Sequence, residues 1–449
     1  MIIKLIQPKM RKRPMDTGMK TQMSPSLGLL TIANMLQDKH TIIYENENAA
    51  PINYDEKVDI VGISITVDIF PRAVEIAKKF QSKNIPVIAG GIHITANPEE
   101  TAEYFDAISI GIAETTWYDI INDFEKGCLK KVYKHNTSDI TPSQIKSPAY
   151  NLIKEKNYLY SNIISTSRGC PFKCDFCYNS CDAYKNLYIN RNIDDVINDI
   201  KLINKKHIMF IDDNLIGNPK WTMEFVKALK PLNVKWNAAV SLNIADMPEL
   251  LDEMKASGCQ SLFIGFESIN ESSISNVNKV QNNLEKYNYA VNEIHKRGIM
   301  INASFVFGLD GDDKSVFEST LKWIVDNKIE TVTSHILTPY PGTHLYKEFL
   351  ETGRIIDFDY SKYNTANVVF QPKKMTVDEL QQGYLKIYKD IYSFKNIIKR
   401  TPKAKNQWIP YYLFNIFYRK YGKFTDLVCR IIGYKIVGKI AAFLSYHTK

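Results

Sequence analysis

The sequence predicts an α/β protein with two successive strand–helix series and a helical C-terminal region. Short apolar segments alternate with amphipathic segments of helical spacing in residues 1–127 and again in residues 161–360. Such alternation is typical of parallel sheets covered by crossover helices. The alternation ends near residue 361, so residues 361–449 are expected to be helical. A chain of 449 residues is also too long for one ordinary core, which predicts two or three domains.

The first series predicts a doubly wound parallel sheet. Expected strands lie at residues 2–6, 41–44, 59–65, 86–89 and 107–110, and expected helices at 26–36, 71–82 and 116–124. Ligands of such sheets bind beyond the carboxyl ends of the strands. The segments at those ends are 64–70, 90–95 and 111–114, which makes them candidate ligand loops. Residues 128–160 are polar and contain two prolines, and we expect a linker there.

The second series predicts a partial barrel of six strand–helix units. Expected strands lie at residues 162–166, 208–211, 234–238, 261–264, 301–307 and 332–337, and expected helices at 193–202, 221–229, 248–257 and 284–297. Six units are fewer than the eight of a closed barrel. Behind them, residues 376–394 predict a helix with Thr376 as its N-cap and acidic residues in its first turn.

Hydropathy and cysteine content narrow the class of protein. No window of 18 uninterrupted apolar residues predicts a transmembrane helix, and the N-terminal apolar stretch precedes the basic cluster, the reverse of a secretory signal. We therefore expect a cytoplasmic protein. Seven cysteines do not form a disulfide framework in a chain of this length, yet four of them fall within twelve residues. In a reducing compartment such a cluster favours metal binding.

Three of these cysteines, Cys170, Cys174 and Cys177, follow the first strand of the second series with the spacing Cys-x3-Cys-x2-Cys. Three thiolates on one tight loop can bind three corners of a [4Fe–4S] cluster and leave one iron open. The open iron can take the amino and carboxylate groups of a methionine moiety. Cys181 offers a fourth ligand, so a structural zinc site is an alternative. An iron–sulfur electron carrier is the non-catalytic alternative.

This segment resembles the signature of the radical S-adenosylmethionine superfamily, and the resemblance extends over most of residues 160–345. It implies a [4Fe–4S] cluster on the three cysteines, S-adenosylmethionine as cofactor, and an external one-electron donor such as flavodoxin or ferredoxin. Reductive cleavage of S-adenosylmethionine then yields a 5′-deoxyadenosyl radical that abstracts hydrogen from an unactivated C–H bond. The protein's part is to hold the cofactor, exclude water and position the substrate.

The same resemblance assigns cofactor contacts to residues at the strand ends. Phe176 is expected near the adenine, and residues 305–310, with Gly308, are expected to contact it through backbone. Asp212 and Asp213 are expected to face the cofactor, and Glu267 and Ser268 to bind its ribose or amino group. Residues 339–343 match a sixth-strand loop of one branch. The alternatives are helix capping for the two aspartates, a solvated acid for Glu267, and a tight turn for Gly308.

The first domain, over nearly all of residues 1–125, resembles the domain of the cobalamin-binding subgroup of this superfamily, through the segments 25–29, 61–64, 90–95 and 98–100. The resemblance implies cobalamin as a further cofactor. The cofactor-binding residues expected here are Ser64, Thr66, Gly90, Gly91, His93, Gly111 and Glu114. This chain departs from the usual Gly-Glu-Gly-Glu loop, because its residues 111–114 read Gly-Ile-Ala-Glu. A sheet that binds nothing is the alternative.

His93 does not lie in the Asp-x-His-x-x-Gly motif that supplies an axial histidine in some corrinoid proteins. We therefore expect it near the corrin edge rather than on cobalt, with cobalt ligation and a structural hydrogen bond as alternatives. Residues 64–70 are the other candidates for contact with the lower corrin face.

If cobalamin binds, the resemblance implies a C-methyltransferase acting on an unactivated carbon. The family also contains ring-forming and ring-contracting members, so a radical cyclase or oxidoreductase without methyl transfer is the alternative.

The C-terminal region is basic and aromatic. Residues 395–449 carry twelve Lys or Arg and one acid, a net charge of +11, whereas the other 394 residues sum to −3. Basic residues interleaved with Trp, Tyr and Phe are typical of segments at an anionic lipid surface. We therefore expect peripheral contact with the inner face of the membrane through residues 395–449, and a small-molecule or lipid substrate such as an isoprenoid. A helical lid on the barrel is the alternative, and nucleic acid is disfavoured because no binding module is recognisable.

Overall fold

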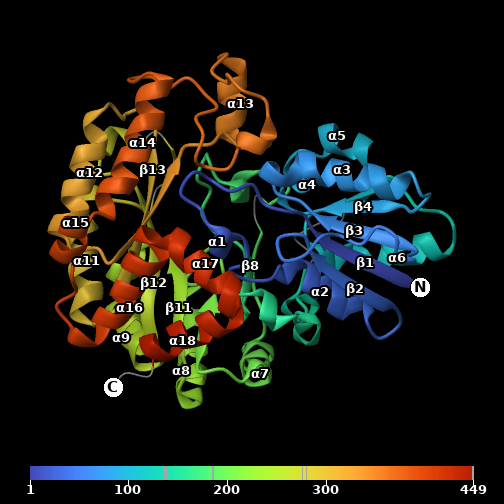
Figure 1. Cartoon of the computed structure of the whole chain (residues 1–449), viewed down its shortest axis with the longest axis horizontal. Helices are drawn as coiled ribbons and strands as arrows, with labels where there is room; N and C mark the ends of the chain where they lie inside the picture. The colour runs from blue at the N-terminus through green and yellow to red at the C-terminus, as the bar shows by residue number, and fades with distance from the viewer. Residues whose placement is uncertain (135–139, 185–186, 276, 280, 447–449) are drawn as a thin grey trace.

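The computed structural model describes residues 1–134, 140–184, 187–275, 277–279 and 281–446. Figure 1 shows two lobes: an N-terminal α/β lobe in blue and a barrel lobe running from green to orange, with the C-terminal helices in red packed against the barrel. The predicted order of two α/β units and a helical region is confirmed. Residues 135–139 of the expected linker and 447–449 of the expected helical region lie outside the described residues.

The N-terminal lobe is a doubly wound parallel sheet of order β2-β1-β3-β4-β5-β6. Its strands are β1 (Ile2–Gln7), β2 (Thr41–Asn46), β3 (Ile60–Ser64), β4 (Val87–Gly90), β5 (Ala107–Ile110) and β6 (Val132–Lys134). The helix α3 (Phe70–Gln81) packs on one face, and α2 (Leu27–Leu36) and α6 (Trp117–Glu125) pack on the other. The chain passes from β1 to β2 on one side and then returns across β1 to β3 on the other side. Doubly wound sheets bind ligands at such a switch point.

The strand β6 is one that the sequence prediction missed. The prediction ended the sheet at residues 107–110 and treated residues 128–160 as linker, but Val132 pairs in parallel with Ile108 of β5. Of the three residues of β6, Tyr133 is buried and its neighbours are exposed. A three-residue edge strand with one buried side chain carries too little periodicity to be recognised.

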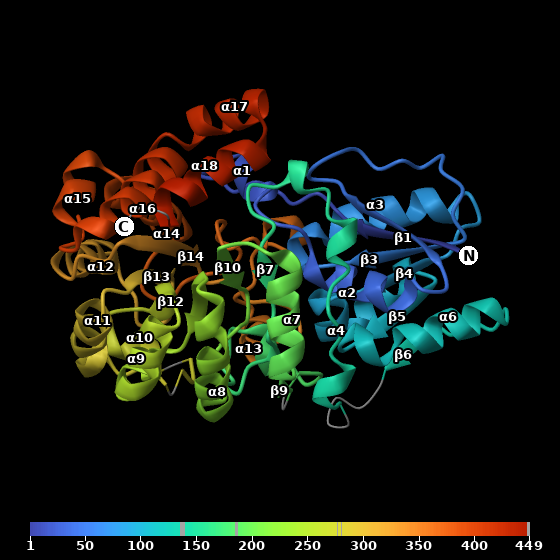
Figure 2. The ribbon, with the colours of Figure 1, turned by 90° about the horizontal axis from the view of Figure 1, so that it is seen from below.

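The second sheet is a parallel partial barrel of six strands, as predicted, and its strand order is β14-β13-β12-β11-β10-β7. Its two edge strands leave one side open, and the N-terminal lobe lies on the side of β7 (Figure 2). The strands are β7 (Ile163–Ile164), β10 (His207–Phe210), β11 (Lys235–Val240), β12 (Cys259–Glu267), β13 (Met300–Phe307) and β14 (Thr331–Ile336). The covering helices are α7 (Ile193–Ile203), α8 (Pro219–Leu229), α9 (Pro248–Ala256), α11 (Tyr287–Lys296), α12 (Ser315–Asp326) and α13 (His344–Glu351).

The C-terminal region is helical, as predicted. It comprises α14 (Val377–Ile391), α15 (Phe394–Lys399), α16 (Trp408–Tyr412), a π-helical turn (Leu413–Lys420), α17 (Gly422–Ile432) and α18 (Tyr434–Tyr446). Thr376 and Glu379 form a capping box at the start of α14. The last helices cover the amino ends of the barrel strands, because the Tyr446 ring stacks on His207 at the start of β10 with 3.8 Å between centroids. Within the described ranges, no helix has the length and apolar character needed to span a bilayer.

Candidate active site

The four clustered cysteines lie on one loop between two short antiparallel strands, β8 (Ser167–Gly169) and β9 (Tyr188–Asn190). Burial raises the pKa of the Cys170 thiol to about 11 and that of Cys177 to about 12. The charges of Cys170, Cys174 and Cys177 act on one another and add to these increases. The three thiols therefore influence one another from a single loop.

Cys181 is buried at the end of this loop, and its thiol accepts backbone N–H groups of Ala183 and Tyr184. The charges that act on Cys170 come instead from Asp213, Cys174 and Lys279, and those that act on Cys177 come from Asp213, Cys174 and Cys170. In the part of the chain that the structure describes, no set of three His, Cys, Asp or Glu side chains is gathered as around a single metal ion.

A segment that the sequence analysis did not single out packs directly on the cysteine loop. It joins α10 (Glu271–Ser275) to α11, and its described residues are 277–279 and 281–286. Gln281 donates to the sulfur of Cys174 at 3.6 Å. The Asp175 N–H donates to the Val277 carbonyl at 3.2 Å. This segment therefore forms one wall of the cysteine site.

Lys279, from the same wall, forms a buried ion pair with Glu267. Both side chains are 9% exposed, and the ammonium charge lowers the pKa of Cys170 and Cys174. Glu267 has a φ of 64°, a conformation that non-glycine residues seldom adopt, and β12 shifts register there against β13. The bulge at the end of β12 thus directs Glu267 to Lys279 beside the cysteines. No spacing in the sequence marks Lys279, because its partner lies twelve residues away across a loop.

Asp212 follows β10 and fixes the turn that leads into the cysteine loop. Its Oδ1 accepts the N–H groups of Thr166 at 2.8 Å and Ser167 at 2.6 Å, and also the Ser167 hydroxyl. Burial raises the pKa of this carboxyl. Its Oδ2 is buried with no hydrogen-bond partner in the protein. One oxygen therefore positions the loop, and the other is available to a ligand.

Asp213, the next residue, accepts a hydrogen bond from Asn179 at 3.1 Å. Its charge raises the pKa of Cys170 and Cys177, which places its carboxylate near the cysteines. The surrounding chain raises the pKa of the Asp213 carboxyl through burial, although the residue is exposed. A ligand at the cysteine loop can therefore reach this carboxylate.

Ser268 and Gly308 meet at a second buried carboxylate, Asp312. Asp312 accepts the N–H groups of Gly308 and Leu309 at 3.1 Å, and hydroxyl groups of Ser268 at 3.4 Å and Ser273 at 2.5 Å. Burial outweighs these bonds and raises the pKa of Asp312 to about 6. Asp312 thus ties the loop after β12 to the loop after β13. The sequence analysis placed both loops at the site but missed the residue that joins them.

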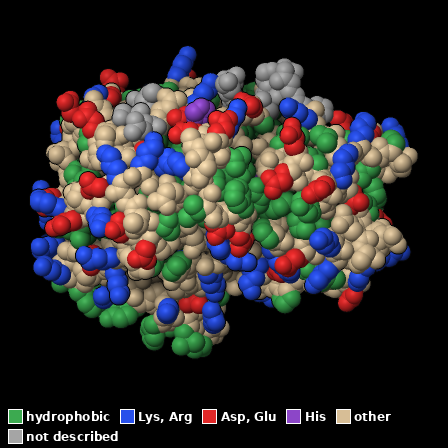
Figure 3. All heavy atoms as spheres, turned by 90° about the horizontal axis from the view of Figure 1, so that it is seen from above, with side chains coloured by type: hydrophobic (Ala, Val, Ile, Leu, Met, Phe, Trp, Pro, Cys, Tyr) green, Lys and Arg blue, Asp and Glu red, His purple; other side chains and the backbone are tan. Residues whose placement is uncertain are grey.

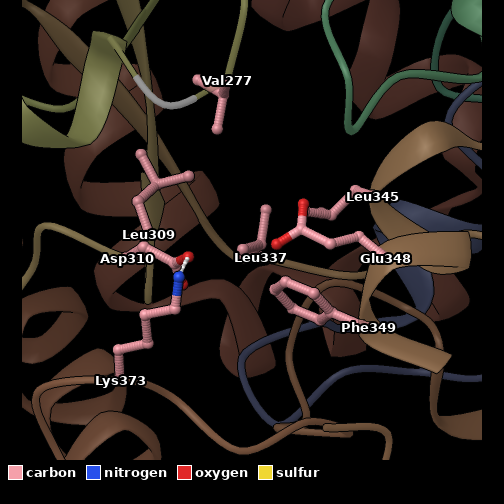
Figure 4. A pocket seen from close by; sticks show the side chains of 8 residues that line it. All are labelled: Val277, Leu309, Asp310, Leu337, Leu345, Glu348, Phe349 and Lys373. Atoms are coloured by element: carbon pink, nitrogen blue, oxygen red, sulfur yellow. Dashed lines mark ion pairs between the residues drawn. The ribbon is translucent and has the colours of Figure 1, made fainter. Parts of the chain in front are cut away.

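A cavity of about 220 Å³ opens between the loops after β13 and β14 (Figure 4). The cavity adjoins the cysteine loop through the backbone of Asp175. The Asp175 N–H donates to the Val277 carbonyl on one wall, and the Asp175 carbonyl accepts the Leu345 N–H on another. Phe176, on the cysteine loop, packs against the barrel core. The cavity is lined by Val277, Leu309, Asp310, Leu337, Leu345, Glu348, Phe349 and Lys373.

In the N-terminal lobe, the predicted ligand loops gather at the carboxyl ends of β3, β4 and β5. Ser64 ends β3, and the hydroxyl of Thr66 donates to Asp68 at 2.7 Å. Gly90 ends β4. Gly91 has a φ of 104°, and a Cβ there would lie 2.7 Å from the Ile65 nitrogen, so only glycine fits this approach of the two loops.

His93 lies on the short helix α4 (Ile92–Ala96), completely buried between the rings of Phe70 and Tyr360 at centroid distances of 5.0 and 5.2 Å. Burial lowers its pKa to about 4, so the imidazole is neutral. Both ring nitrogens are buried with no hydrogen-bond partner in the protein. A structural hydrogen bond, one of the alternatives for His93, is therefore not found among the described residues.

Gly111 and Glu114 connect the two lobes. Glu114 forms an ion pair with Arg168 at 2.9 Å, two residues before the first cysteine, and both side chains are largely buried. The Gly111 N–H donates to Thr95 at 3.0 Å, and its carbonyl accepts the Tyr184 hydroxyl at 3.5 Å. The loop after β5 therefore abuts the cysteine loop directly.

The rings of Tyr178, next to Cys177, and Tyr340, in the loop after β14, stack at 4.6 Å, and the charge of Asp68 acts on both. Gly342 of the same loop lies against the N-terminal lobe, because a Cβ there would be 2.1 Å from the Ala96 carbonyl oxygen. Loops from both sheets thus enclose one space around the cysteines.

Several buried polar atoms at this junction have no hydrogen-bond partner in the protein: the Tyr178 hydroxyl, Asp212 Oδ2, Gln281 Oε1 and both His93 nitrogens. Each such atom costs about 1–3 kcal/mol unless something else satisfies it. Their concentration at the cysteine loop and the loop after β4 fits polar cofactors bound at both places.

Comparison with protein families finds two matches that correspond to the two sheets. Residues 164–324 match the radical SAM superfamily, and residues 21–121 match the B12 binding domain. A third match, over residues 343–416, is to a domain of unknown function (DUF4070).

Curated relatives match nearly the whole chain. Bacteriochlorophyllide d C-12(1)-methyltransferase of Chlorobaculum tepidum is 30% identical over 433 residues, which are 93% of each chain. Bacteriochlorophyllide d C-8(2)-methyltransferase of the same organism is 30% identical over 404 residues, 86% of this chain and 89% of that one. The structure of OxsB, a cobalamin-dependent S-adenosylmethionine radical enzyme, superposes with a TM-score of 0.65 at 14% identity, over 98% of this chain and 72% of that chain, which concerns the fold. With both domain matches in order and full-length relatives at this identity, the chain belongs to the cobalamin-binding family of radical S-adenosylmethionine enzymes, whose cofactors are a [4Fe–4S] cluster, S-adenosylmethionine and cobalamin.

Proposed function

We propose that this enzyme transfers a methyl group to an unactivated carbon of a small or lipid substrate. The observation that carries the proposal is the direct junction of two candidate cofactor sites through the Arg168–Glu114 ion pair at 2.9 Å. A carbon held there adjoins both the cysteine loop and the loops of the doubly wound sheet. The two Chlorobaculum tepidum relatives are named as methyltransferases that act at carbon positions, which supports the same reaction class.

Particular residues are proposed for each cofactor. Cys170, Cys174 and Cys177 would bind the cluster, and Asp213, Glu267 and Lys279, whose charges surround these thiols, would contact the polar groups of S-adenosylmethionine. The adenine would lie by Phe176 and the cavity of Figure 4, against backbone at Gly308. Ser64, Thr66, Gly90, Gly91, His93 and Gly111 would contact cobalamin.

When bound, these cofactors supply an electron, a carbon radical and a transferable methyl group. The chain's own residues hold the geometry. Asp212 fixes the turn before the cysteine loop, Asp312 joins the loops after β12 and β13, and the Tyr178–Tyr340 stack roofs the space between the lobes. Asp212 and Asp312 are buried, and the two tyrosine rings are partly buried, so these groups would help to keep water from the reacting atoms. The electron would come from an external donor such as flavodoxin or ferredoxin.

The reaction is tested with anaerobically reconstituted enzyme, a reductant, trideuteromethyl-labelled S-adenosylmethionine and a lipid extract of the native cells. We expect 5′-deoxyadenosine and S-adenosylhomocysteine in about equal amounts, and a trideuterated methyl group in one extracted compound by mass spectrometry. Cleavage to 5′-deoxyadenosine with neither S-adenosylhomocysteine nor label transfer would contradict methyl transfer and would favour the cyclase or oxidoreductase alternative. Absence of all cleavage would contradict both.

We also propose that the enzyme works in the cytoplasm at the inner face of the membrane, docked through its C-terminal helices. On α17, Phe424, Leu427 and Ile431 are 63%, 54% and 76% exposed and lie three and four residues apart, so they form one outward stripe. On α18, Ile436, Ile440 and Phe443 are 49%, 52% and 62% exposed with the same spacing. These helices present apolar stripes to solvent, the reverse of an ordinary surface helix.

Basic residues surround these stripes, which favours an anionic lipid surface over an uncharged apolar partner. Lys423, Arg430, Lys435 and Lys439 lie on α17 and α18 beside the exposed apolar residues, in a region of net charge +11. Figure 2 places α17 and α18 on the outer side of the barrel lobe, and in Figure 3 hydrophobic and basic side chains gather along the lower edge of the molecule. Apolar insertion and attraction to anionic headgroups then act together.

The double variant Phe424→Glu/Ile431→Glu should bind vesicles of phosphatidylcholine with phosphatidylglycerol at least about tenfold more weakly than the wild type, because each side chain loses roughly 1.5–3 kcal/mol of burial. Co-sedimentation at increasing salt measures the binding. Leu202→Glu on α7, where the leucine is 69% exposed, is the matched control and should bind as the wild type does. Failure of the wild type to bind, or an equal loss in the control, would refute the docking surface.

A further inference from the structure

The inner face of the partial barrel is hollow. Residues on the outer face of its strands, such as Trp236, Leu262 and Ile301, are fully buried under helices. Many inward residues of the same strands are only partly buried, although a filled barrel would bury them, and the buried exceptions include His207, Ser304 and Val306. These partly accessible inward residues include Met209, Asn237, Ala239, Ser261, Phe263, Asn302, Thr333 and His335.

The hollow has an apolar side and a floor. Met209 and Phe263 line the side of β10 and β12, and Ile211, just after β10, is 43% exposed although it precedes the buried Asp212. The floor is at the amino end of the barrel, where Tyr446 of α18 stacks on His207 and accepts a hydrogen bond from Asn237 at 3.4 Å.

The opposite side is closed by residues 8–25, which follow β1 and cross the open side of the barrel. Met15 packs against the barrel core and accepts the Tyr384 hydroxyl, and Arg13 donates to Thr365 at 3.3 Å. His335 of β14 contacts the same Thr365 hydroxyl at 3.0 Å. Arg13 and His335 therefore meet on one wall of the hollow.

This wall carries excess positive charge. Burial lowers the pKa of His335 most, and the positive charges of Arg13, Lys20 and Arg419 lower it further, to about 3. Asp16 offsets one of these charges through hydrogen bonds to Arg13 at 2.9 and 3.3 Å. Arg419 instead lies among the rings of Tyr388, Tyr392, Phe414 and Tyr418, at 5.2–5.7 Å from their centroids, and its Nε is buried without a partner.

Lys20 has the position of a ligand-binding cation. The residue is exposed, yet burial by the surrounding chain is the largest influence on the pKa of its ammonium and lowers it, followed by the charge of Arg13. Its ammonium is therefore accessible to a ligand and has protein on several sides. A lysine and an arginine held there without full compensation are stabilised by an anion.

We propose that the hollow binds a substrate with an apolar body and an acidic group, a carboxylate or a phosphate, whose anionic oxygens contact Lys20 and Arg419. The apolar body would lie along Met209, Ile211 and Phe263. The charge of Arg13 lowers the pKa of both Asp68 and Tyr340. The charge of Cys177 acts on Tyr340 as well, so Tyr340 lies between the cationic wall and the cysteine site. The inference deepens the proposed function by naming the substrate class, and it rests on that function only for calling the ligand a substrate.

Binding of 11-(dansylamino)undecanoic acid to the reconstituted holoenzyme, followed by fluorescence, tests this site. We expect the acid to bind at least about tenfold more tightly than its methyl ester, and Lys20→Gln to remove that preference, because a charged hydrogen bond contributes on the order of a tenfold change in affinity. Lys20→Arg should retain it. Competition by dodecanoate and by dodecyl phosphate decides which acid the wall prefers, with dodecanol as the neutral comparison.

Two controls separate the hollow from the lipid-docking surface and from general folding defects. Phe424→Glu/Ile431→Glu should bind the probe as the wild type does, and so should Lys39→Gln in the turn after α2. Equal affinity for acid and ester, or an unchanged acid preference in Lys20→Gln, would overturn the proposal. Probe binding needs no turnover, so failure of methyl transfer would not contradict a positive binding result. Failure of probe binding would likewise leave the methyl-transfer proposal untouched.

Discussion

Replacing Cys174 with Ala is expected to abolish reductive cleavage of S-adenosylmethionine. The cysteine is 8% exposed, its sulfur accepts a hydrogen bond from Gln281, and it shares its surroundings with Cys170 and Cys177. Loss of a ligand should exceed the roughly 10–100-fold effect of losing an outer partner of a metal site. Formation of 5′-deoxyadenosine under anaerobic reduction measures the activity, and visible absorbance with iron content measures the cluster.

Cys181→Ala is the matched control, because Cys181 is also buried and lies on the same loop. Its thiol accepts backbone N–H groups, and a fourth thiolate would close the iron that the methionine moiety needs. We therefore expect Cys181→Ala to keep the cluster and the cleavage. Full cleavage by Cys174→Ala, or loss of the cluster in Cys181→Ala, would refute the three-cysteine assignment.

The fold was predictable because its strands and helices bury apolar residues in regular patterns. Strands such as β3 and β13 are buried over most of their residues, and α3 and α6 each have one apolar face. The parallel direction of the strands then follows from the helices that connect them. β6 and the hairpin of β8 and β9 escaped prediction because three-residue strands are held by their neighbours rather than by their own pattern.

The candidate site was predictable only where its chemistry lies in a short motif. Cys170, Cys174 and Cys177 are close in sequence, so their spacing alone brings the thiols together. Lys279 and Asp312 are polar loop residues whose partners arrive from other elements, and no local pattern distinguishes them from solvated residues. The same holds for Arg13 and Lys20, which enter the barrel only because residues 8–25 cross its open side.

Lys279→Met is expected to destabilise the barrel lobe strongly. It removes one partner of a buried ion pair and leaves Glu267 charged at 7% exposure, in a strained backbone conformation. Breaking such a pair costs about 3–5 kcal/mol, because the remaining charge is desolvated without compensation. For a unit of this size that corresponds to a fall of roughly 6–20 °C in the unfolding midpoint. Differential scanning fluorimetry of the purified protein measures the shift.

Two further variants show whether the pair serves stability, the cofactor, or both. Lys286→Met removes a surface pair with Asp246, in which the side chains are 50% and 46% exposed, and should cost less than about 1 kcal/mol. Glu267→Gln/Lys279→Met removes both buried charges, so it should regain most of the lost stability. If the pair also contacts S-adenosylmethionine, this double variant should remain folded while its cleavage of S-adenosylmethionine falls sharply. Wild-type stability together with wild-type cleavage in the double variant would show that Glu267 and Lys279 do not belong to the site. If Lys279→Met is as stable as Lys286→Met, the pair does not have the stabilising role of a buried ion pair.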